Sequence, residues 1–482
     1  MVNIKLIARI LGLILILEGL FIVVSASISY FFIEPDFTLI LLSSLIPISV
    51  GLLLRILIKK TDKTPGKRDG YLLVTSAWII FTLFGTLPFI ITGAIPDFTD
   101  AFFETMSGLT TTGATILKDI EAMSHGLLFW RSLTQWIGGI GIIILSLSVL
   151  PIMKTINKQL FTSDIAGPTT DKLHPRIIET AKRLLAVYSI LTLLEMFFLM
   201  GGGMSWFDSI CHSMTTMSTG GFSTRNDNIS AFTSPYIRTV ITVFMFMAGT
   251  NLTLFYFGFH FRFKKIYNNA EFLFYLTICI LATGVVTSLL HYKSGIDLLQ
   301  SFQEASFNVV SIVTTTGLYA SNYNLWGSFL VVLLLLLMLV GGSAGSTGGS
   351  VKIIRWLLTI KNFRIELHRL LHPSAIIPVR INHKAVPQDL VYSVMIFVVL
   401  YLMIVSSSTF IISLMGYDIQ TSFSTAAAAL GNIGPGVGAF GPFSNYSGLP
   451  DFGKWFLSAL MLIGRLEIFT VLILFSKGFY KN

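Results

Sequence analysis

The sequence predicts an all-α polytopic membrane protein made of four repeats, each a span, a re-entrant half-helix and a second span, with two additional N-terminal spans. Composition is the first observation. Hydrophobic residues make up 53% of the 482 residues and charged residues only 12%, against about 25% charged residues in an average soluble protein. The second observation is a set of four short segments that each close a half-length apolar stretch at a glycine. These glycines are separated by 107, 97 and 117 residues, so one unit recurs four times.

The long apolar runs are the expected spans. A helix needs about 20 apolar residues to cross a hydrocarbon core of about 30 Å. The expected spans cover residues 5–32, 38–58, 71–93, 126–150, 179–200, 236–260, 271–291, 325–360 (interrupted), 389–415 and 453–476. The first run is longer than the apolar core of a signal peptide and lacks a small-residue cleavage site, so we expect it to remain as a span. The predicted domains are 1–68 for the two N-terminal spans and 69–155, 156–265, 266–372 and 373–482 for the repeats.

The short apolar segments cannot cross a membrane. They cover residues 100–112, 207–219, 298–316 and 420–433. A helix of about 13 residues is only about 20 Å long at a rise of 1.5 Å per residue, so it must enter and return on the same side. Each begins near an acid suited to a helix N-terminus, namely Asp100, Asp208, Asp297 and Asp418. The glycine-containing returns should therefore line a cavity, because irregular backbone is tolerated at membrane depth only there or inside protein.

Basic residues fix the expected orientation. They gather in the stretches 55–68, 154–183, 262–265, 361–384 and 477–481. Since cytoplasmic loops carry the excess of Lys and Arg, we expect both termini to be cytoplasmic and the half-helices to enter from outside. The net charge of +9 is explained in this way, and no motif for binding nucleic acid accompanies it.

The ends of the half-helices predict a cation site. A helix that ends at the membrane centre points the negative end of its dipole there, and four such ends around one pore favour a desolvated cation. Glycine permits the backbone to turn its carbonyls inward, and a ring of carbonyls can replace the hydration shell of an ion. The candidate filter residues are Thr111, Thr112, Gly113, Ser218, Thr219, Gly220, Thr315, Thr316, Gly317, Asn432, Ile433 and Gly434. The alternative, packing of Thr and Gly between spans, does not explain four short segments.

The eighth expected span is interrupted by a stretch rich in glycine and serine. Glycine disfavours a helix by up to about 1 kcal/mol per residue, so this stretch should unwind within the membrane. It consists of Gly341, Gly342, Ser343, Ala344, Gly345, Ser346, Thr347, Gly348 and Gly349, followed by Ser350. A phosphate-binding loop is a competing interpretation, but the GK[ST] signature is absent. A passive kink is the other alternative.

Arg465 lies in the middle of the last expected span. An ionisable residue at that depth is expensive, and a functional role is the first hypothesis. The alternative is a structural ion pair, for which Glu18, Glu195 and Glu467 are the candidate partners.

The remaining polar signals are weak. His368 and His372 have the spacing of a metal pair, but no third ligand is evident, so a solvated helix face or a docking surface is the better interpretation and no transition metal is expected. Cys211 and Cys279 lack the spacing of a metal or disulfide framework. No catalytic dyad, triad or carboxylate pair emerges, so the sequence does not predict an enzyme.

These features together resemble the Trk/Ktr/HKT superfamily of cation transporters, and its TrkH-type potassium uptake branch in particular. Further motifs carry the resemblance: TQWIGGIG at 134–141, GGSAGSTGG at 341–349 and GRLE at 464–467. The two additional N-terminal spans favour the TrkH branch. The fourth filter segment, NIGPG at 432–436, departs from TTG but resembles the divergent fourth repeat of the family.

The resemblance implies a function and partners. It implies potassium uptake across the bacterial inner membrane, with K⁺ as the transported ion and no cofactor. It further implies that residues 341–349 form a gating loop beneath the filter and that Arg465 faces the cavity below. In relatives a serine at the first filter glycine is associated with sodium permeation, so Gly113 points to potassium. The family forms homodimers and binds a cytoplasmic nucleotide-binding subunit of the TrkA type. This chain has no GxGxxG followed by an acidic ribose contact, so nucleotide control should come from outside it.

One alternative from another class stays open. Broken helices and internal repeats also mark ion-coupled secondary transporters of small solutes. That class commonly has inverted or paired repeats around a solute pocket, whereas four units with filter-like glycines favour a pore.

Overall fold

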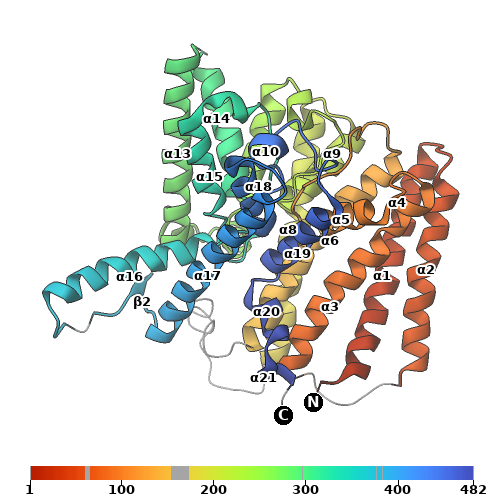
Figure 1. Ribbon diagram of the computed structural model, residues 1–482, viewed down its shortest axis with the longest axis horizontal. Coiled ribbons are helices and arrows are strands. Elements are labelled where there is room, and N and C mark those ends of the chain that lie inside the picture. Colours follow the sequence, from red (N-terminus) through yellow and green to blue (C-terminus); the bar gives the residue numbers. More distant parts are fainter. Residues whose placement is uncertain are drawn as a thin grey trace.

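The computed structural model describes residues 2–59, 66–152, 173–295, 297–375, 377–382 and 384–480. The predicted all-α polytopic fold is confirmed (Figure 1). Within these residues the strands are one short antiparallel pair, β1 (Arg380–Ile381) and β2 (Lys384–Ala385). Residues 153–172, which hold much of the second predicted basic stretch and the predicted boundary between 155 and 156, lie outside the described residues.

Two long helices at the N-terminus, α1 (Ile4–Phe31) and α2 (Phe37–Leu57), pack against each other at one edge of the molecule (Figure 1). Small residues bring their backbones together. A Cβ built on Gly12 would lie 2.9 Å from the carbonyl oxygen of Gly51, and one built on Gly51 would lie 2.5 Å from that of Gly12. Such close crossings at small residues are typical of helices that pack in a membrane. This hairpin corresponds to the two additional spans that the sequence predicts.

Four series of a span, a short helix and a second span or its equivalent follow along the chain. The first series is α3 (Lys67–Gly85), α4 (Leu87–Thr92), α5 (Phe98–Leu109) and α6 (His125–Ile152). The second is α8 (Leu173–Gly201), α9 (Trp206–Met217), η2 (Asn228–Ala231), α10 (Pro235–Ala248) and α11 (Leu252–Phe259). The third is α12 (Lys264–Tyr267), α13 (Ala270–Ser294), α14 (Leu298–Val313), η3 (Tyr323–Trp326), α15 (Ser328–Met338) and α16 (Ile353–Leu371). The fourth is α17 (Gln388–Ser413), α18 (Ile419–Gly431), η4 (Gly438–Phe440), α19 (Asp451–Arg465), α20 (Phe469–Leu472), η5 (Ile473–Phe475) and α21 (Lys477–Tyr480).

The short helices α5, α9, α14 and α18 are 12, 12, 16 and 13 residues long. A polar side chain at each N-terminus accepts a hydrogen bond from a backbone N–H of the first turn, which satisfies a donor that the helix itself leaves free. The capping residues are Asp97, Ser205, Asp297 and Asp418. The predicted acids Asp100 and Asp208 lie instead in the first turn, where a negative charge is also favoured.

Six helices in the described residues are long and apolar enough to cross a membrane, or eight if each bent helix pair counts as one span. The bends are 104° between α10 and α11 and 107° between α19 and α20 with η5. The predicted spans 236–260 and 453–476 are therefore broken rather than straight. At the first break Asn251 caps α11, and at the second Glu467 has a φ of 56°. α6 and the interrupted pair α15 and α16 occupy the places of the other two predicted spans.

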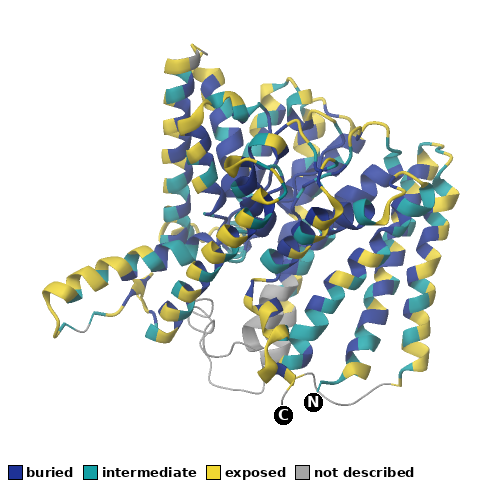
Figure 2. Ribbon diagram, in the orientation of Figure 1, coloured by how far each residue is buried: buried dark blue, intermediate teal, exposed yellow. Residues whose placement is uncertain are grey.

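Burial is greatest where the short helices meet the spans (Figure 2). All residues of α18 from Ser424 to Gly431 are buried, as are all those of α5 from Ala101 to Leu109. Five of these 17 residues are polar: Glu104, Thr105, Ser107, Ser424 and Thr425. The four short helices therefore end inside the protein, and they bring four polar backbone turns together there.

Candidate functional site

Each short helix is followed by a turn of the same backbone shape. A residue with positive φ comes first, at 52° for Thr111, 55° for Thr219, 60° for Thr315 and 53° for Asn432. Two residues later a glycine has positive φ, at 85° for Gly113, 82° for Gly221, 76° for Gly317 and 100° for Gly434. A threonine in this region is a genuine outlier, and such strain, on the order of 1–3 kcal/mol per residue, is concentrated at functional sites. The four turns therefore have one common conformation, and we call residues 111–116, 219–224, 315–320 and 432–437 segments 1 to 4.

The four segments form a closed ring. A Cβ built on Gly113 would lie 2.1 Å from the carbonyl oxygen of Gly220, so segment 1 contacts segment 2. The same construction brings Gly221 to 2.2 Å from the oxygen of Thr316, Gly317 to 1.9 Å from that of Ile433, and Gly434 to 2.5 Å from that of Thr112. Each segment thus presents one carbonyl against the α-carbon of a glycine in its neighbour, and only glycine fits at that approach. The cycle of four returns to its start, and we call the oxygens of Thr112, Gly220, Thr316 and Ile433 the carbonyl ring.

The second segment differs from the prediction by one residue. The sequence motif pairs Gly220 with Gly113, whereas the backbone pairs Gly221 with it and Gly220 with Thr112. Gly220 therefore contributes a ring carbonyl from a residue without a side chain. The amide of Gln135 fills the vacant space, because a Cβ on Gly220 would lie 2.4 Å from its Cδ. Ser218 and Thr219 lie one position earlier in the turn than the motif implies.

The predicted filter residues nevertheless come together, and all but one of them are fully buried; Gly113 is half-buried. Hydroxyl groups support the turns: Thr110 bonds Thr112 at 2.8 Å, and Thr314 bonds Thr316 at 2.7 Å. Asn432 takes a different part, since its Nδ2 donates to Thr112 Oγ1 at 3.0 Å and joins segment 4 to segment 1. The contact closes the ring between the two ends of the repeat series.

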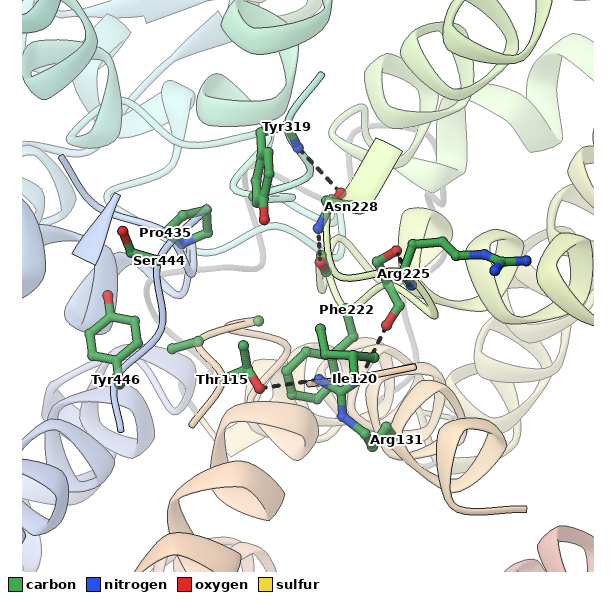
Figure 3. A pocket seen from close by; sticks show the side chains of 15 residues that line it. Thr115, Ile120, Arg131, Phe222, Arg225, Asn228, Tyr319, Pro435, Ser444 and Tyr446 are labelled. Carbon is green, nitrogen blue, oxygen red and sulfur yellow. Dashed lines mark hydrogen bonds between the residues drawn. The ribbon is translucent and has the colours of Figure 1, made fainter. Parts of the chain in front are cut away.

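A small pocket opens on one side of the ring, and residues from all four segments line it (Figure 3). Tyr446 Oη donates to the carbonyl of Gly434 at 2.9 Å, and its backbone N–H donates to the carbonyl of Thr115 at 2.8 Å. The loops around this pocket are also bonded to one another. Asn226 Nδ2 donates to Asp119 at 2.9 Å, and this bond holds the pKa of the Asp119 carboxyl below its usual value.

The glycine- and serine-rich stretch is unwound, as its composition predicts, and it lies against the opposite side of the ring. α15 ends at Met338, α16 begins at Ile353, and no helix joins them. Gly349 N donates to Thr315 Oγ1 at 2.7 Å, and Thr347 Oγ1 donates to the carbonyl of Met217 at 3.0 Å. A Cβ built on Gly349 would lie 2.2 Å from the carbonyl oxygen of Gly431. The loop therefore contacts the ends of three of the four short helices.

Arg465 connects this loop to the first repeat. Its side chain is 2% exposed, with Nη1 donating to the carbonyl of Thr347 at 2.7 Å and Nη2 to the carbonyl of Gly138 at 2.9 Å. The alternative of an ion pair with a buried carboxylate is not what the described residues show. Glu467 pairs with Arg355 at 2.6 Å, and none of the ion pairs within these residues includes Arg465, Glu18 or Glu195.

Several residues that hold the site were not singled out from the sequence. Lys352 is buried, and its Nζ donates to the carbonyl of Gly348 within the loop. Glu271 accepts a bond from the backbone N–H of Ala344 at 2.6 Å. Arg131 lies within the predicted span 126–150 and Lys352 within 325–360, so the reasoning that drew attention to Arg465 applies to both.

The described residues contain no group of three or more His, Cys, Asp or Glu side chains that could hold a metal ion. His368 and His372 have ring centroids 4.8 Å apart on α16 and its end. Cys211 and Cys279 are buried and free.

Known proteins match nearly the whole chain. Residues 38–481 match the family described as "TrkH: Cation transport protein". The Trk system potassium uptake protein TrkH of Halomonas elongata is 36% identical over 483 residues, which cover 100% of both chains. The protein of the same name from Escherichia coli K12 is 38% identical over 428 residues, 86% of each chain. The crystal structure of the potassium transporter TrkH from Vibrio parahaemolyticus superposes with a TM-score of 0.90 at 34% identity and covers 99% of this chain and 100% of that one.

Proposed function

The chain belongs to the TrkH family of cation transport proteins, and from this premise we propose that it takes up potassium ions through a pore lined by the carbonyl ring. The family is one of transporters and not of enzymes. The observation that carries the proposal is the closed cycle of four backbone carbonyls at the buried ends of four short helices.

The ring offers a dehydrated cation oxygen ligands in place of the water oxygens that it has lost. Each short helix directs the negative end of its dipole toward the ring, and backbone carbonyls replace hydration oxygens. We propose that K⁺ is bound by the filter segments predicted from the sequence, with Gly221 added because its backbone matches that of the other three ring glycines. A monovalent cation needs no charged ligand in such a site, which agrees with the neutral side chains of all four segments.

We further propose that the loop 341–349 and Arg465 form the gate. The loop contacts the ring on the side opposite the pocket, and the guanidinium group of Arg465 bonds it in place. A buried positive charge beside the path repels a passing cation in a medium of low dielectric constant. Lys352 belongs to the same closed arrangement, because its ammonium group bonds a carbonyl of the loop.

Partners and orientation belong to the proposal as well. We expect a bacterial inner-membrane protein with both termini in the cytoplasm, and α1 begins and α21 ends at the same end of the molecule (Figure 1). A homodimer and a cytoplasmic nucleotide-binding subunit of the TrkA type are the expected partners. Helix α16 projects from the body of the molecule (Figure 1) and begins at Ile353, directly after the loop, so a regulatory partner bound to this helix would lie next to the gate.

Rubidium uptake into liposomes that hold the purified protein tests this function. The wild-type protein should accumulate rubidium, with potassium as a strong competitor and sodium as a weak one. Gly317→Ala should abolish uptake, because its Cβ would lie 1.9 Å from the carbonyl oxygen of Ile433. Gly284→Ala is the matched control, since no atom lies within 4 Å of a Cβ there. Uptake of an organic solute by the wild type, or unchanged rubidium uptake by Gly317→Ala, would contradict the proposal.

A further inference from the structure

Helix α6 carries two buried polar side chains, Arg131 and Gln135, one turn apart at the height of the carbonyl ring. Arg131 is 1% exposed and Gln135 is fully buried. Both bond residues of segment 2, although α6 belongs to the first repeat. They therefore connect two neighbouring quarters of the ring.

Gln135 positions the carbonyl of Gly220, which is the one residue of the carbonyl ring without a side chain. Its Nε2 donates to the oxygen of Gly220 at 2.7 Å, and its Oε1 accepts a bond from the backbone N–H of Phe222 at 3.2 Å. The amide also occupies the space that a side chain at position 220 would fill. Segment 2 is thus positioned by a residue of another repeat, whereas Thr112 and Thr316 in segments 1 and 3 use their own hydroxyl groups.

Arg131 joins segment 2 to segment 1. Its Nη1 donates to the carbonyl of Ser223 at 3.1 Å, and its guanidinium carbon lies 4.1 Å from the ring centroid of Phe222. On the other side Nε donates to Glu104 at 2.9 Å. The Glu104 carboxylate in turn accepts bonds from Thr115 Oγ1 at 3.0 Å and from the backbone N–H of Ile116 at 2.9 Å. Figure 3 shows the guanidinium group of Arg131 over Phe222, with a hydrogen bond from its Nη2 to Thr115 Oγ1.

The fourth repeat provides an internal comparison. A Cβ on Gly138 of α6 would lie 1.9 Å from the carbonyl oxygen of Leu109 at the end of α5, and one on Gly464 of α19 would lie 1.9 Å from that of Leu430 near the end of α18. Because Gly138 and Gly464 make the same contact, α6 and α19 can be matched residue by residue from these two positions. The positions of Arg131 and Gln135 then correspond to Leu457 and Met461, which are buried apolar residues. Packing of a span against its short helix therefore does not require the polar pair.

We propose that Arg131 and Gln135 are positioning residues that hold segments 1 and 2 in register and thereby set the preference of the ring for potassium over sodium. The inference rests on the proposed function. A ring that fits the larger ion must be kept from closing on the smaller one, either by its size or by the number of carbonyls that it holds in place. A supporting residue does this when its own geometry is fixed by packing and hydrogen bonds, and both side chains meet that condition.

The test compares Gln135→Met and Arg131→Lys with the wild type in rubidium uptake into liposomes, with sodium as competitor. Gln135→Met introduces the residue that α19 carries at this place, and Arg131→Lys keeps the charge but loses the fork that reaches Glu104 and Ser223 together. Inhibition by sodium relative to potassium should rise about tenfold, the factor that corresponds to about 1.4 kcal/mol. Asp100→Asn is the matched control, because Asp100 lies on the same helix as Glu104. This change removes a charge pair with Lys454 at 2.5 Å and should leave the ratio of sodium to potassium inhibition unchanged.

Folding is measured separately, by thermal unfolding of each purified variant. If Arg131→Lys yields no folded protein, Gln135→Met and Thr115→Val decide the question, because Thr115→Val removes the hydroxyl group that Glu104 holds and keeps the buried charge pair. Folded variants with the wild-type ratio would overturn the inference, even where stability falls. A wild-type protein that takes up no rubidium would instead refute the proposed function, so the two failures are distinguishable.

Discussion

Replacing Arg465 with alanine should increase flux in the absence of any regulatory subunit. The side chain donates to the loop carbonyl of Thr347 at 2.7 Å and to the carbonyl of Gly138 at 2.9 Å. Alanine removes both bonds and, under the proposed gate, the positive charge beside the ion path. Only the bond to Thr347 joins the arginine to the loop, so that bond is the one whose loss favours opening.

The magnitude follows from that bond. A hydrogen bond to a charged group contributes about 1.5–3 kcal/mol, and about 1.4 kcal/mol changes an equilibrium tenfold. The ratio of closed to open loop should therefore fall by about tenfold to a hundredfold. Flux per folded molecule should rise by up to that factor, and loss of the repulsion between arginine and ion adds to the increase.

The assay is rubidium flux into liposomes, normalised to the amount of folded protein. A short deletion within residues 344–348 should raise flux in the same way, and the combination with Arg465→Ala should add less than the sum, because the two changes remove one shared contact. Arg364→Ala on α16, an exposed arginine, controls for the change in net charge. Unchanged or reduced flux in both the Arg465 variant and the deletion would refute the gate. A purely structural role would appear as a lower yield of folded protein with normal flux per molecule.

Three further predictions concern the ring, the loop and nucleotides. Gly113→Ser should raise sodium uptake relative to rubidium, because a Cβ at a φ of 85° would lie 2.1 Å from the carbonyl oxygen of Gly220; competition assays that give the wild-type ratio would remove Gly113 from the filter. Lys352→Met should raise flux per folded molecule, since the ammonium group that bonds the Gly348 carbonyl is lost while the buried volume is kept; flux equal to or below that of the wild type would exclude a part in closure. ATP and NADH should leave flux through the isolated protein unchanged, and a reproducible nucleotide effect in liposomes without a second subunit would contradict this.

Much of the fold could be predicted because it depends on length and hydropathy. The expected span 271–291 is α13 (Ala270–Ser294), and the expected span 389–415 is α17 (Gln388–Ser413). The break after α19 could not be predicted in the same way. Its turn residue, Glu467, has a φ of 56° and pairs with Arg355, which lies more than 100 residues away in the chain. A local pattern contains no information on such a contact.

The segments predicted as the filter lie together in the structure, but segment 2 differs from the predicted register by one residue, and the cause is equally physical. Two glycines stand in a row at 220 and 221, and the motif alone favours the first. The side chain that decides between them, Gln135, comes from another helix and occupies the space beside Gly220. Arg131 and Lys352 were recognisable as charges within expected spans, but only the three-dimensional contacts show that each reaches the ring or the loop.

The backbone of the ring is nearly fourfold, whereas the side chains that support it are not. Segment 2 depends on Gln135, segment 4 on Tyr446 and on Tyr323, which donates to the carbonyl of Gly436 at 3.0 Å. Under the proposed function, binding of one ion at the axis requires only that the four carbonyls match, so each repeat is free to hold its carbonyl with different residues. This explains why the residue identities of the four repeats resemble one another mainly at the turns. It also implies that a side chain added at Gly113, Gly221, Gly317 or Gly434 meets the same kind of obstacle, a neighbouring carbonyl. Changes in the supporting residues should instead affect one junction of the ring at a time.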